Sequence, residues 1–321
     1  MVVSASIAFD IIMSFGGSIA DHIIPDKTHV ISVSFLVDSM RKLRGGVAGN
    51  IAYSLALLGT RSTLVGSVGA DFGPYREALL ELGVDLSAVV EDPEMLTASA
   101  FMMADQAGNQ IASFFPGPSA QAADIPVKVL GEGTAYAIVG ATDPEVMRRH
   151  AREFGAAACR MIYDPAFQIV ILSGEELRAG IDAAWALIGN DYEFAMIERK
   201  TGLTVDQLAA TVPLVVVTYG EQGSELISGG DRVRVPAAPA RNLKEPTGAG
   251  DAYRAGMTKG LLLGKELAVV GRIAGLAAVH AVEHHGPQEH AYTAAEFVAR
   301  FDESYPDHAG AVTVEELTAA G

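Results

Sequence analysis

The sequence predicts an α/β fold in which a mostly parallel sheet is wound between layers of helices. Three observations favour this class. Short apolar runs alternate with helical patterns along most of the 321 residues, several helical stretches begin with capping residues, and half of the residues are hydrophobic while 19% are charged. The length favours one large domain, or one large and one small domain, and a chain this long can bury a large core.

The apolar runs that predict buried strands are short, and several end in Gly, Asp or Asn. They cover residues 2–9, 62–67, 135–140, 159–163, 184–188 and 214–218. Helices are expected between them, because Asp143-Pro144 is typical of a helix start and capping boxes begin at Ser173, Thr204 and Thr293. Strand–helix alternation implies βαβ units and therefore a parallel sheet.

Two segments depart from this alternation. Residues 10–38 contain two β-type runs, 11–14 and 30–37, without a convincing helix. Residues 97–104 and 110–115 predict a hairpin around a loop that contains Gly and Asn. We expect these segments, within the bounds 11–40 and 96–116, to form a small β-sheet beside the wound one.

Charge and cysteine content exclude several classes of function. With 23 Lys+Arg against 39 Asp+Glu, the formal net charge of −16 argues against partners such as nucleic acid or an anionic membrane. A single cysteine, Cys159, permits neither an intrachain disulfide nor a Cys-based zinc site. The N-terminus does not resemble a signal peptide and no apolar run reaches membrane-spanning length, so we expect a soluble cytoplasmic protein.

The strongest local motif is the turn EPTGAGD, residues 245–251, at the start of a predicted helix. Gly248 and Gly250 leave backbone N–H groups uncovered at a helix N-terminus, where an anion is favoured. Asp251 follows in the first turn and could accept a proton from a hydroxyl that attacks a phosphoryl group. The alternative is an ordinary turn in which Asp251 only favours the helix start.

Three further motifs have both a functional and a structural interpretation. RGGVAGN, residues 44–50, could bring backbone close to a ligand while Asn50 grips hydroxyls, or could pack a helix tightly on the sheet. Asn190 and Glu193 follow a strand, where they could hold Mg²⁺ through water or form a capping box. TYGEQG, residues 218–223, could contact a nucleotide or form a simple glycine turn.

Isolated polar residues add weaker signals. Asp10 is expected at the carboxyl end of the first strand, where it could accept hydrogen bonds from vicinal hydroxyls or simply be solvated. His280 and His284 are four residues apart on a predicted helix, but a third metal ligand is not evident. The role of the neighbouring pair His284–His285 stays open.

These motifs, in this order, resemble the ribokinase (PfkB) family of carbohydrate and nucleoside kinases over nearly the whole chain. RGGVAGN is similar to the N-terminal signature of that family, EPTGAGDAYRAG to its C-terminal signature, and NDYE to its Asn-x-x-Glu motif. More narrowly, SIAFD, SFLVDSMRKLRGGVAGN, NQIASFFPG, LSGEELR and NDYEFAMIERKTG resemble bacterial adenosine kinases. The resemblance implies one ribokinase-like domain over residues 1–321, in which the small β-sheet of segments 11–40 and 96–116 is a lid.

The resemblance also implies a reaction and a set of site residues. ATP would be the donor, with Mg²⁺, and the γ-phosphoryl group would pass to the 5′-hydroxyl of adenosine to give AMP and ADP. Asp251 would be the base, with an anion hole built from the amides of Gly248, Ala249 and Gly250. The implied substrate-binding residues are Ser6, Asp10, Ser34, Gly46, Asn50, Phe114 and Gln168. Those implied for ATP and for water-bound Mg²⁺ are Asn190, Glu193, Thr218, Gly220 and Gly223.

Some positions and alternatives stay open at this point. Phe114 and Phe115 face opposite ways on a strand, so one of them can stack on a base, and the resemblance favours Phe114. Phe167 stands where close relatives carry a polar residue. Some members of the family hold a monovalent cation near the positions of Glu245 and Thr247, but Glu245 replaces the usual Asp, which leaves K⁺ activation open.

Other functions compete with this interpretation. A ribokinase- or fructokinase-like sugar kinase and a kinase for other nucleosides would share the fold. A catalytically silent nucleoside-binding protein would share the pocket without the reaction. The open edges of the small sheet also favour a homodimer formed through the lid.

Overall fold

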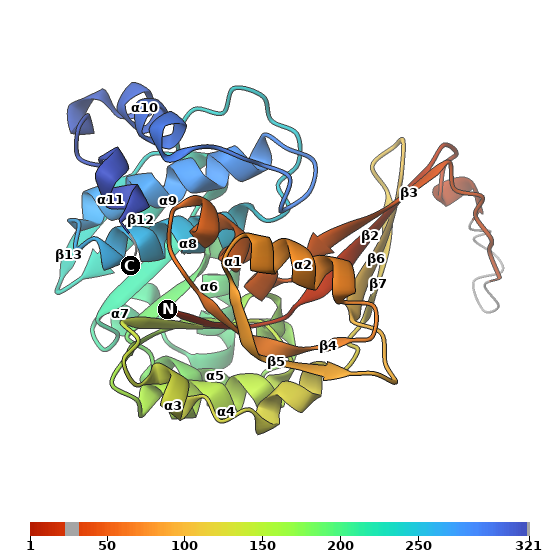
Figure 1. The fold of residues 1–321 in the computed structure, drawn as a ribbon, viewed down its shortest axis with the longest axis horizontal. Helices are drawn as coiled ribbons and strands as arrows, with labels where there is room; N and C mark the ends of the chain where they lie inside the picture. Colours follow the sequence, from red (N-terminus) through yellow and green to blue (C-terminus); the bar gives the residue numbers. More distant parts are fainter. Residues whose placement is uncertain (23–31, 320–321) are drawn as a thin grey trace.

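The computed structural model describes residues 1–22 and 32–319, which form two β-sheets of unequal size (Figure 1). The larger sheet has nine strands in this part of the chain, in the spatial order β13-β12-β11-β10-β9-β8-β1-β4-β5. They are β1 (Val2–Ser4), β4 (Thr63–Gly69), β5 (Asp85–Asp92), β8 (Tyr136–Gly140), β9 (Arg160–Asp164), β10 (Ala186–Asn190), β11 (Leu214–Thr218), β12 (Ser224–Ser228) and β13 (Asp231–Val235). Only the pairings of β12 with β11 and β13 are antiparallel among these described strands, so the predicted mostly parallel sheet is confirmed.

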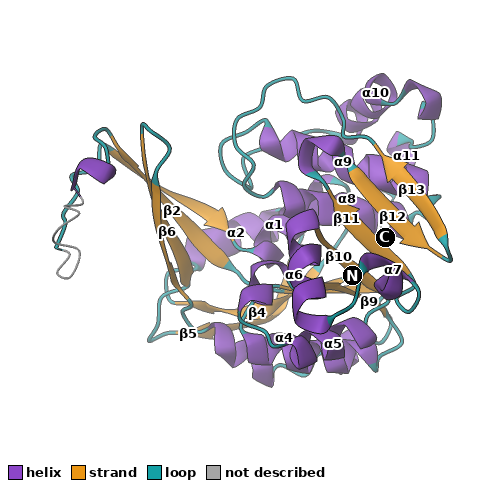
Figure 2. Ribbon diagram, turned by 180° about the vertical axis from the view of Figure 1, so that it is seen from behind, coloured by secondary structure: helices purple, strands orange, loops and turns teal. Residues whose placement is uncertain are grey.

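Helices cover both faces of the large sheet (Figure 2). One face packs on α1 (Val47–Leu57), α2 (Gly73–Glu81), α8 (Ala249–Leu262) and α9 (Leu267–Val282). The other packs on α3 (Lys128–Gly131), α4 (Pro144–Gly155), α5 (Gly174–Asp182), α6 (Asp191–Thr201) and α7 (Val205–Ala209). Neighbouring residues of a strand serve opposite cores: Ile138 of β8 joins the first core and Val139 the second.

The C-terminal helices α10 (Ala294–Ser304) and α11 (Val314–Thr318) form a third core with α9. None of the helices within residues 1–22 and 32–319 is long and apolar enough to cross a lipid bilayer.

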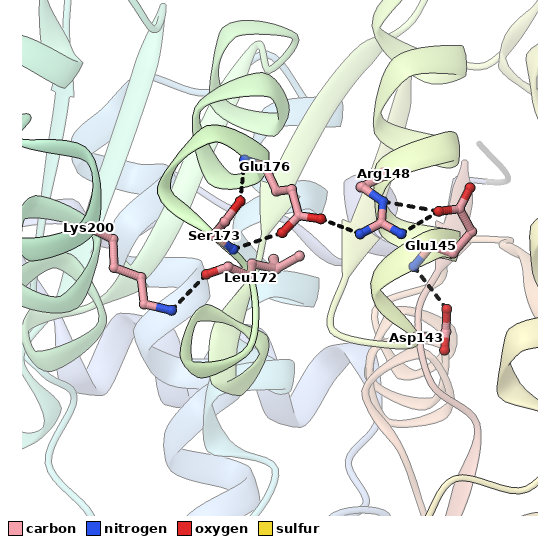
Figure 3. Close-up of polar contacts among 7 residues, drawn as sticks. All are labelled: Asp143, Glu145, Arg148, Leu172, Ser173, Glu176 and Lys200. Carbon is pink, nitrogen blue, oxygen red and sulfur yellow. Dashed lines mark hydrogen bonds and ion pairs between the residues drawn. The ribbon is translucent and has the colours of Figure 1, made fainter.

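The helix starts follow their sequence signals. The expected capping bonds are formed at Asp143, Ser173, Thr204 and Thr293. Figure 3 shows the capping box of α5, in which Ser173 and Glu176 bond each other's backbone N–H. Arg148 of α4 pairs with the same Glu176, so this box also joins two neighbouring helices.

The small sheet, defined as β2 (Ala8–Phe15), β3 (Ser39–Gly45), β6 (Ala98–Asp105) and β7 (Gln110–Phe115), has the order β3-β2-β6-β7. The hairpin predicted over residues 97–115 is confirmed as β6 and β7. In Figure 1 the small sheet projects from the side of the large one, away from α8 and α9, with the short helical turn η1 (Ala20–His22) at its outer end.

Two predictions at the N-terminal part of this region are wrong. The apolar run 2–9 is not one strand, because the chain leaves the large sheet after Ser4 and enters the small one at Ala8; Asp10 therefore lies inside β2. The β-type run expected at 30–37 contains no strand over 32–37, while residues 30 and 31 lie outside the described part. The strand begins at Ser39, since pairing with β2 selects the charged sequence SMRKLRG.

The chain passes from the small sheet into α1 through Gly46. This residue has φ 80°, in the left-handed region, and a Cβ atom there would collide with the backbone nitrogen of Ala8. The close approach keeps the end of β3, the start of β2 and the first turn of α1 together.

Replacing Gly46 with Ala should therefore destabilise the protein through both backbone strain and the collision. Gly202, the C-cap of α6, has a similar φ of 73° but open space at its Cβ position. We expect Gly202→Ala to lower the free energy of unfolding by about 1 kcal/mol, and Gly46→Ala to lower it by at least about 2 kcal/mol more. Urea denaturation of both variants measures this, and equal losses would contradict the account.

Candidate active site

Two motifs that are 201 residues apart in sequence meet at the start of two helices. Asn50 lies in the first turn of α1 and Asp251 in the first turn of α8, and these helices pack against each other. The Asn50 Nδ2 donates to Asp251 Oδ2 at 2.8 Å. Asn50 is buried and Asp251 is half-buried, so the carboxylate keeps one accessible side.

The turn before Asp251 presents unsatisfied backbone donors. Gly248 is the N-cap of α8 with φ 81°, and a Cβ atom there would lie 2.5 Å from Pro287 Cβ. The N–H of Ala249 donates to Pro246 O at 3.1 Å, which differs from the expectation that all three amides are free, because the turn closes on itself. The N–H groups of Gly248, Gly250 and Asp251 find no acceptor within the described residues, so they can bind an anion.

Burial raises the pKa of Asp251 to about 6. The guanidinium of Arg254 and the hydrogen bond from Asn50 act in the opposite direction, while the carboxylates of Asp164 and Asp10 add to the rise. The group is therefore mostly ionised at neutral pH yet more basic than an ordinary carboxylate, as a general base requires.

Sequence reasoning missed Arg254 and Asp164. Arg254 follows Asp251 by one turn of α8, and its Nη2 donates to Asp164 Oδ1 at 2.5 Å while its Nε pairs with the other oxygen. Although burial opposes it, Asp164 raises the pKa of Arg254, so the guanidinium stays charged. A signal for Asp164 was available, since it directly follows the strand predicted over residues 159–163 and is the last residue of β9.

Asp10 brings a second carboxylate to this region from the small sheet. Its side chain lies against Gly45, where a Cβ atom would collide with it, and no described residue donates to it. Burial and the nearby Glu245 raise its pKa to about 6. Asp10 pairs with Ala100, which pairs with Phe114, so Phe114 shares its face of the small sheet and is 52% exposed.

Three other implied substrate residues have different surroundings. Ser6 is buried, and its Oγ accepts from the N–H of Val47 at 3.2 Å. Gln168 is buried on η4 (Ala166–Val170), where its Nε2 donates to Thr142 O at 2.5 Å and its Oε1 has no partner in the described chain. Ser34 is not brought to the cluster: it is exposed, on the segment that enters β3 at the outer end of the small sheet (Figure 1).

The residues implied for ATP lie along neighbouring strand ends. Asn190 ends β10 and pairs in register with Thr218 at the end of β11. Asn190 and Glu193 form the capping box, with both bonds at 2.8 Å, so the structural alternative is realised here. Gly220 and Gly223 have φ 56° and 88°, and a Cβ atom on Gly223 would collide with a carbonyl of β13.

The surroundings of the turn bear on cation binding. Glu245 Oε2 lies 3.8 Å from His285 Nδ1, and Thr247 is half-buried beside it in sequence. Within residues 1–22 and 32–319, no three His, Cys, Asp or Glu side chains gather into a group that could ligate a metal.

The raised pKa of Asp10 predicts a pH-dependent stability difference. A carboxylate with a folded-state pKa of about 6 and an ordinary value of 3.8 contributes stability below pH 4, and this is lost as pH rises through 6. The Asp10→Asn variant lacks this titration. Its free energy of unfolding, relative to that of the wild type, should therefore rise by about 2 kcal/mol between pH 4 and pH 8. Urea denaturation at both pH values tests this, with the exposed Asp231→Asn as control. A constant difference would contradict the assignment.

The chain is similar to known kinases over most of its length. Residues 11–294 match the model of the pfkB family of carbohydrate kinases. The nucleoside kinase of Methanothermobacter thermautotrophicus is 33% identical over 295 residues, which are 90% of this chain and 95% of that protein. The structure of Burkholderia thailandensis nucleoside kinase with inosine is 36% identical, with a TM-score of 0.86 over 95% of this chain and 98% of that one. Its complex with ADP and inosine is 37% identical, with a TM-score of 0.83 over 95% and 96%. The chain therefore belongs to the pfkB family of carbohydrate kinases.

Proposed function

We propose that this protein is a nucleoside kinase that transfers the γ-phosphoryl group of ATP to the 5′-hydroxyl of adenosine, giving AMP and ADP. The observation that carries the proposal is the half-buried Asp251 carboxylate, held by Asn50 beside unsatisfied N–H groups at the start of α8. Phosphoryl transfer depends mainly on positioning and charge stabilisation, and this arrangement supplies both.

Each part of the site has a task in this reaction. Asp251 accepts the proton of the 5′-hydroxyl as its oxygen bonds the γ-phosphorus, and the bond to the β-phosphate oxygen breaks to release ADP. The N–H groups of Gly248 and Gly250 stabilise the charge on the transferred group. Arg254, kept charged by Asp164, adds positive potential beside the base.

Magnesium fits the residues at the ends of β10 and β11. Asn190 and Glu193 supply amide and carboxylate oxygens, and their capping bonds leave acceptor capacity for water. Mg²⁺ keeps several waters and needs few protein ligands. When bound it would neutralise phosphate charge, with Thr218 and Gly220 beside the nucleotide. K⁺ near Glu245 and Thr247 stays a prediction.

A nucleoside acceptor accounts for the small-sheet residues. Asp10 offers an acceptor to which no described residue donates, which suits the vicinal hydroxyls of ribose, and Phe114 offers an exposed ring on the same sheet face for a base. Gln168 Oε1 is a buried acceptor that suits a purine donor group. A free sugar would leave Phe114 without a stacking partner, so a ribokinase- or fructokinase-like activity is less well supported.

Inosine is the second candidate substrate. The Burkholderia thailandensis relative has been seen with inosine, and the Gln168 acceptor would serve the N1–H of that base as well as the amino group of adenine. A homodimer through the small sheet also stays a prediction. Its edge strands β3 and β7 are mostly exposed, which leaves their pairing groups open to a second copy.

Replacing Asp251 with Asn should lower turnover about 10²–10⁴-fold and leave adenosine binding largely intact, because the proton acceptor is lost while the shape is kept. Coupled ADP release gives turnover and calorimetry gives binding. Asp182→Asn, an exposed carboxylate on α5, is the matched control and should behave as wild type. Unchanged turnover in Asp251→Asn would remove its assigned role.

Replacing Phe114 with Ala should raise the KM for adenosine about 5- to 100-fold, the range expected for the loss of base stacking. Phe115→Ala removes a ring of similar exposure from the opposite face of the same strand and should change KM little. Steady-state kinetics with varied adenosine at saturating ATP separates them. Equal effects of the two substitutions would contradict stacking on Phe114.

A further inference from the structure

A chain of buried polar side chains leads away from the proposed base. Asn50, which donates to Asp251, accepts from Gln288 Nε2 at 2.9 Å through its Oδ1. Gln288 Nε2 also lies 2.5 Å from the Tyr75 hydroxyl, which donates to Gly45 O at 2.9 Å. Gln288, Tyr75 and Asn50 are each at most 5% exposed, so these groups depend on one another for hydrogen bonds.

The donor and acceptor of each hydrogen bond follow from the group at the far end of this polar chain, the carbonyl of Gly45. The Gly45 carbonyl can only accept, so the single hydrogen of Tyr75 goes to it, and Tyr75 must accept from Gln288. Burial raises the pKa of Tyr75, which keeps its hydrogen in place. The NH₂ group of Gln288 therefore donates both to Tyr75 and to Asn50. Asn50 must turn its oxygen toward Gln288 and its NH₂ toward Asp251.

The residues around this polar chain are packed so closely that a side chain at Gly49 would not fit. A Cβ atom on Gly49 would collide with the Tyr75 hydroxyl and lie 3.2 Å from Gln288 Nε2. This explains the last glycine of the RGGVAGN motif without any contact to a ligand. The motif therefore houses the polar chain as well as the turn at Gly46.

We propose that Gln288 is a positioning residue for phosphoryl transfer: one of its N–H groups donates to Tyr75, and the other holds the Asn50 amide in the orientation that donates to the Asp251 carboxylate. This rests on the proposed role of Asp251 as base. The same orientation sets what Asn50 can do for the substrate: a ribose hydroxyl can meet its second N–H or the remaining lone pair of its oxygen.

The consequence is a lower pKa for Asp251 than burial alone would give. The charged groups that face Asp251 are Arg254 on α8, Asp164 on β9 and Asp10 on β2, and none of them is part of the polar chain. Changing Gln288 should therefore act on Asp251 through the Asn50 bond, with these charges unchanged.

Three substitutions grade the effect. Gln288→Met keeps the volume and frees the Asn50 amide, so the pKa of Asp251 should rise by about 0.5–1 unit, the worth of one hydrogen bond. Gln288→Glu accepts instead of donating and adds a carboxylate, so the turned Asn50 amide and charge repulsion together should make the rise larger. Tyr75→Phe removes one anchor of Gln288 and should give a smaller rise.

The pKa is read directly from the ¹³C carboxyl shift of Asp251 in protein labelled at Asp, with Asp251→Asn to assign the signal. The acid limb of kcat/KM for adenosine, with ATP and Mg²⁺, should move to higher pH by the same amounts. Activity at pH 6 should therefore fall several-fold more than activity at pH 8.5. Glu289→Gln in the same loop and Tyr305→Phe at another buried ring are controls and should shift neither readout.

The two readouts separate the two proposals. No rise of the Asp251 pKa in folded Gln288→Met and Tyr75→Phe, which add no charge, would overturn the positioning role, whatever the activity. Undiminished turnover of Asp251→Asn would instead overturn the proposed base, and the NMR titration would still decide whether Gln288 orients Asn50. Tyr75→Phe, which keeps the ring, decides the matter if the Gln288 variants do not fold.

Discussion

The hydrogen bond between Asn50 and Asp251 is the contact on which the organisation of the site depends. It joins the first turns of α1 and α8, two helices whose N-caps are glycines without a side-chain hydrogen bond. Side-chain caps satisfy the N-termini of six other helices, at Asp143, Ser173, Asn190, Thr204, Thr293 and Thr313. The glycine caps bring two helix starts close together, and α8 keeps free N–H groups where its dipole favours an anion.

The charged groups around Asp251 favour ligand binding at the expense of the stability of the fold. The carboxylates of Asp10, Asp164 and Asp251 lie in one region. Among the described residues, Arg254 is the one cation that forms an ion pair with any of them, and it pairs with Asp164. Burial raises the pKa of Asp10 and of Asp251 to about 6, so keeping both ionised costs stability at neutral pH. Donors from a bound substrate would compensate that cost at Asp10, while the polar chain from Gln288 already does so in part at Asp251.

Periodicity and capping residues were sufficient to predict the wound sheet, because each central strand is apolar and most helices begin with a side-chain cap. The edge strands β5 and β13 escaped prediction, since charged residues interrupt them. The switch between sheets after Ser4 was also missed, because a continuous apolar run carries no signal of which sheet each residue joins. Asp251 and Asn50 are candidates from motifs and Asp10 from an expected place at a strand end, whereas Gln288 lies in an irregular loop with no local pattern.

The measurement that tests the central claim most directly is ADP formation from ATP and Mg²⁺ with adenosine, inosine, guanosine, cytidine, ribose and fructose at equal concentrations. The account predicts that adenosine gives the highest kcat/KM, that inosine is the nearest competitor, and that both sugars are poor acceptors because they cannot use Phe114. A higher kcat/KM for ribose or fructose would contradict the nucleoside pocket while leaving the role of Asp251 in place. No turnover of any of the six, with adenosine still bound in calorimetry, would contradict the assignment as a kinase of these compounds and favour a nucleoside-binding protein.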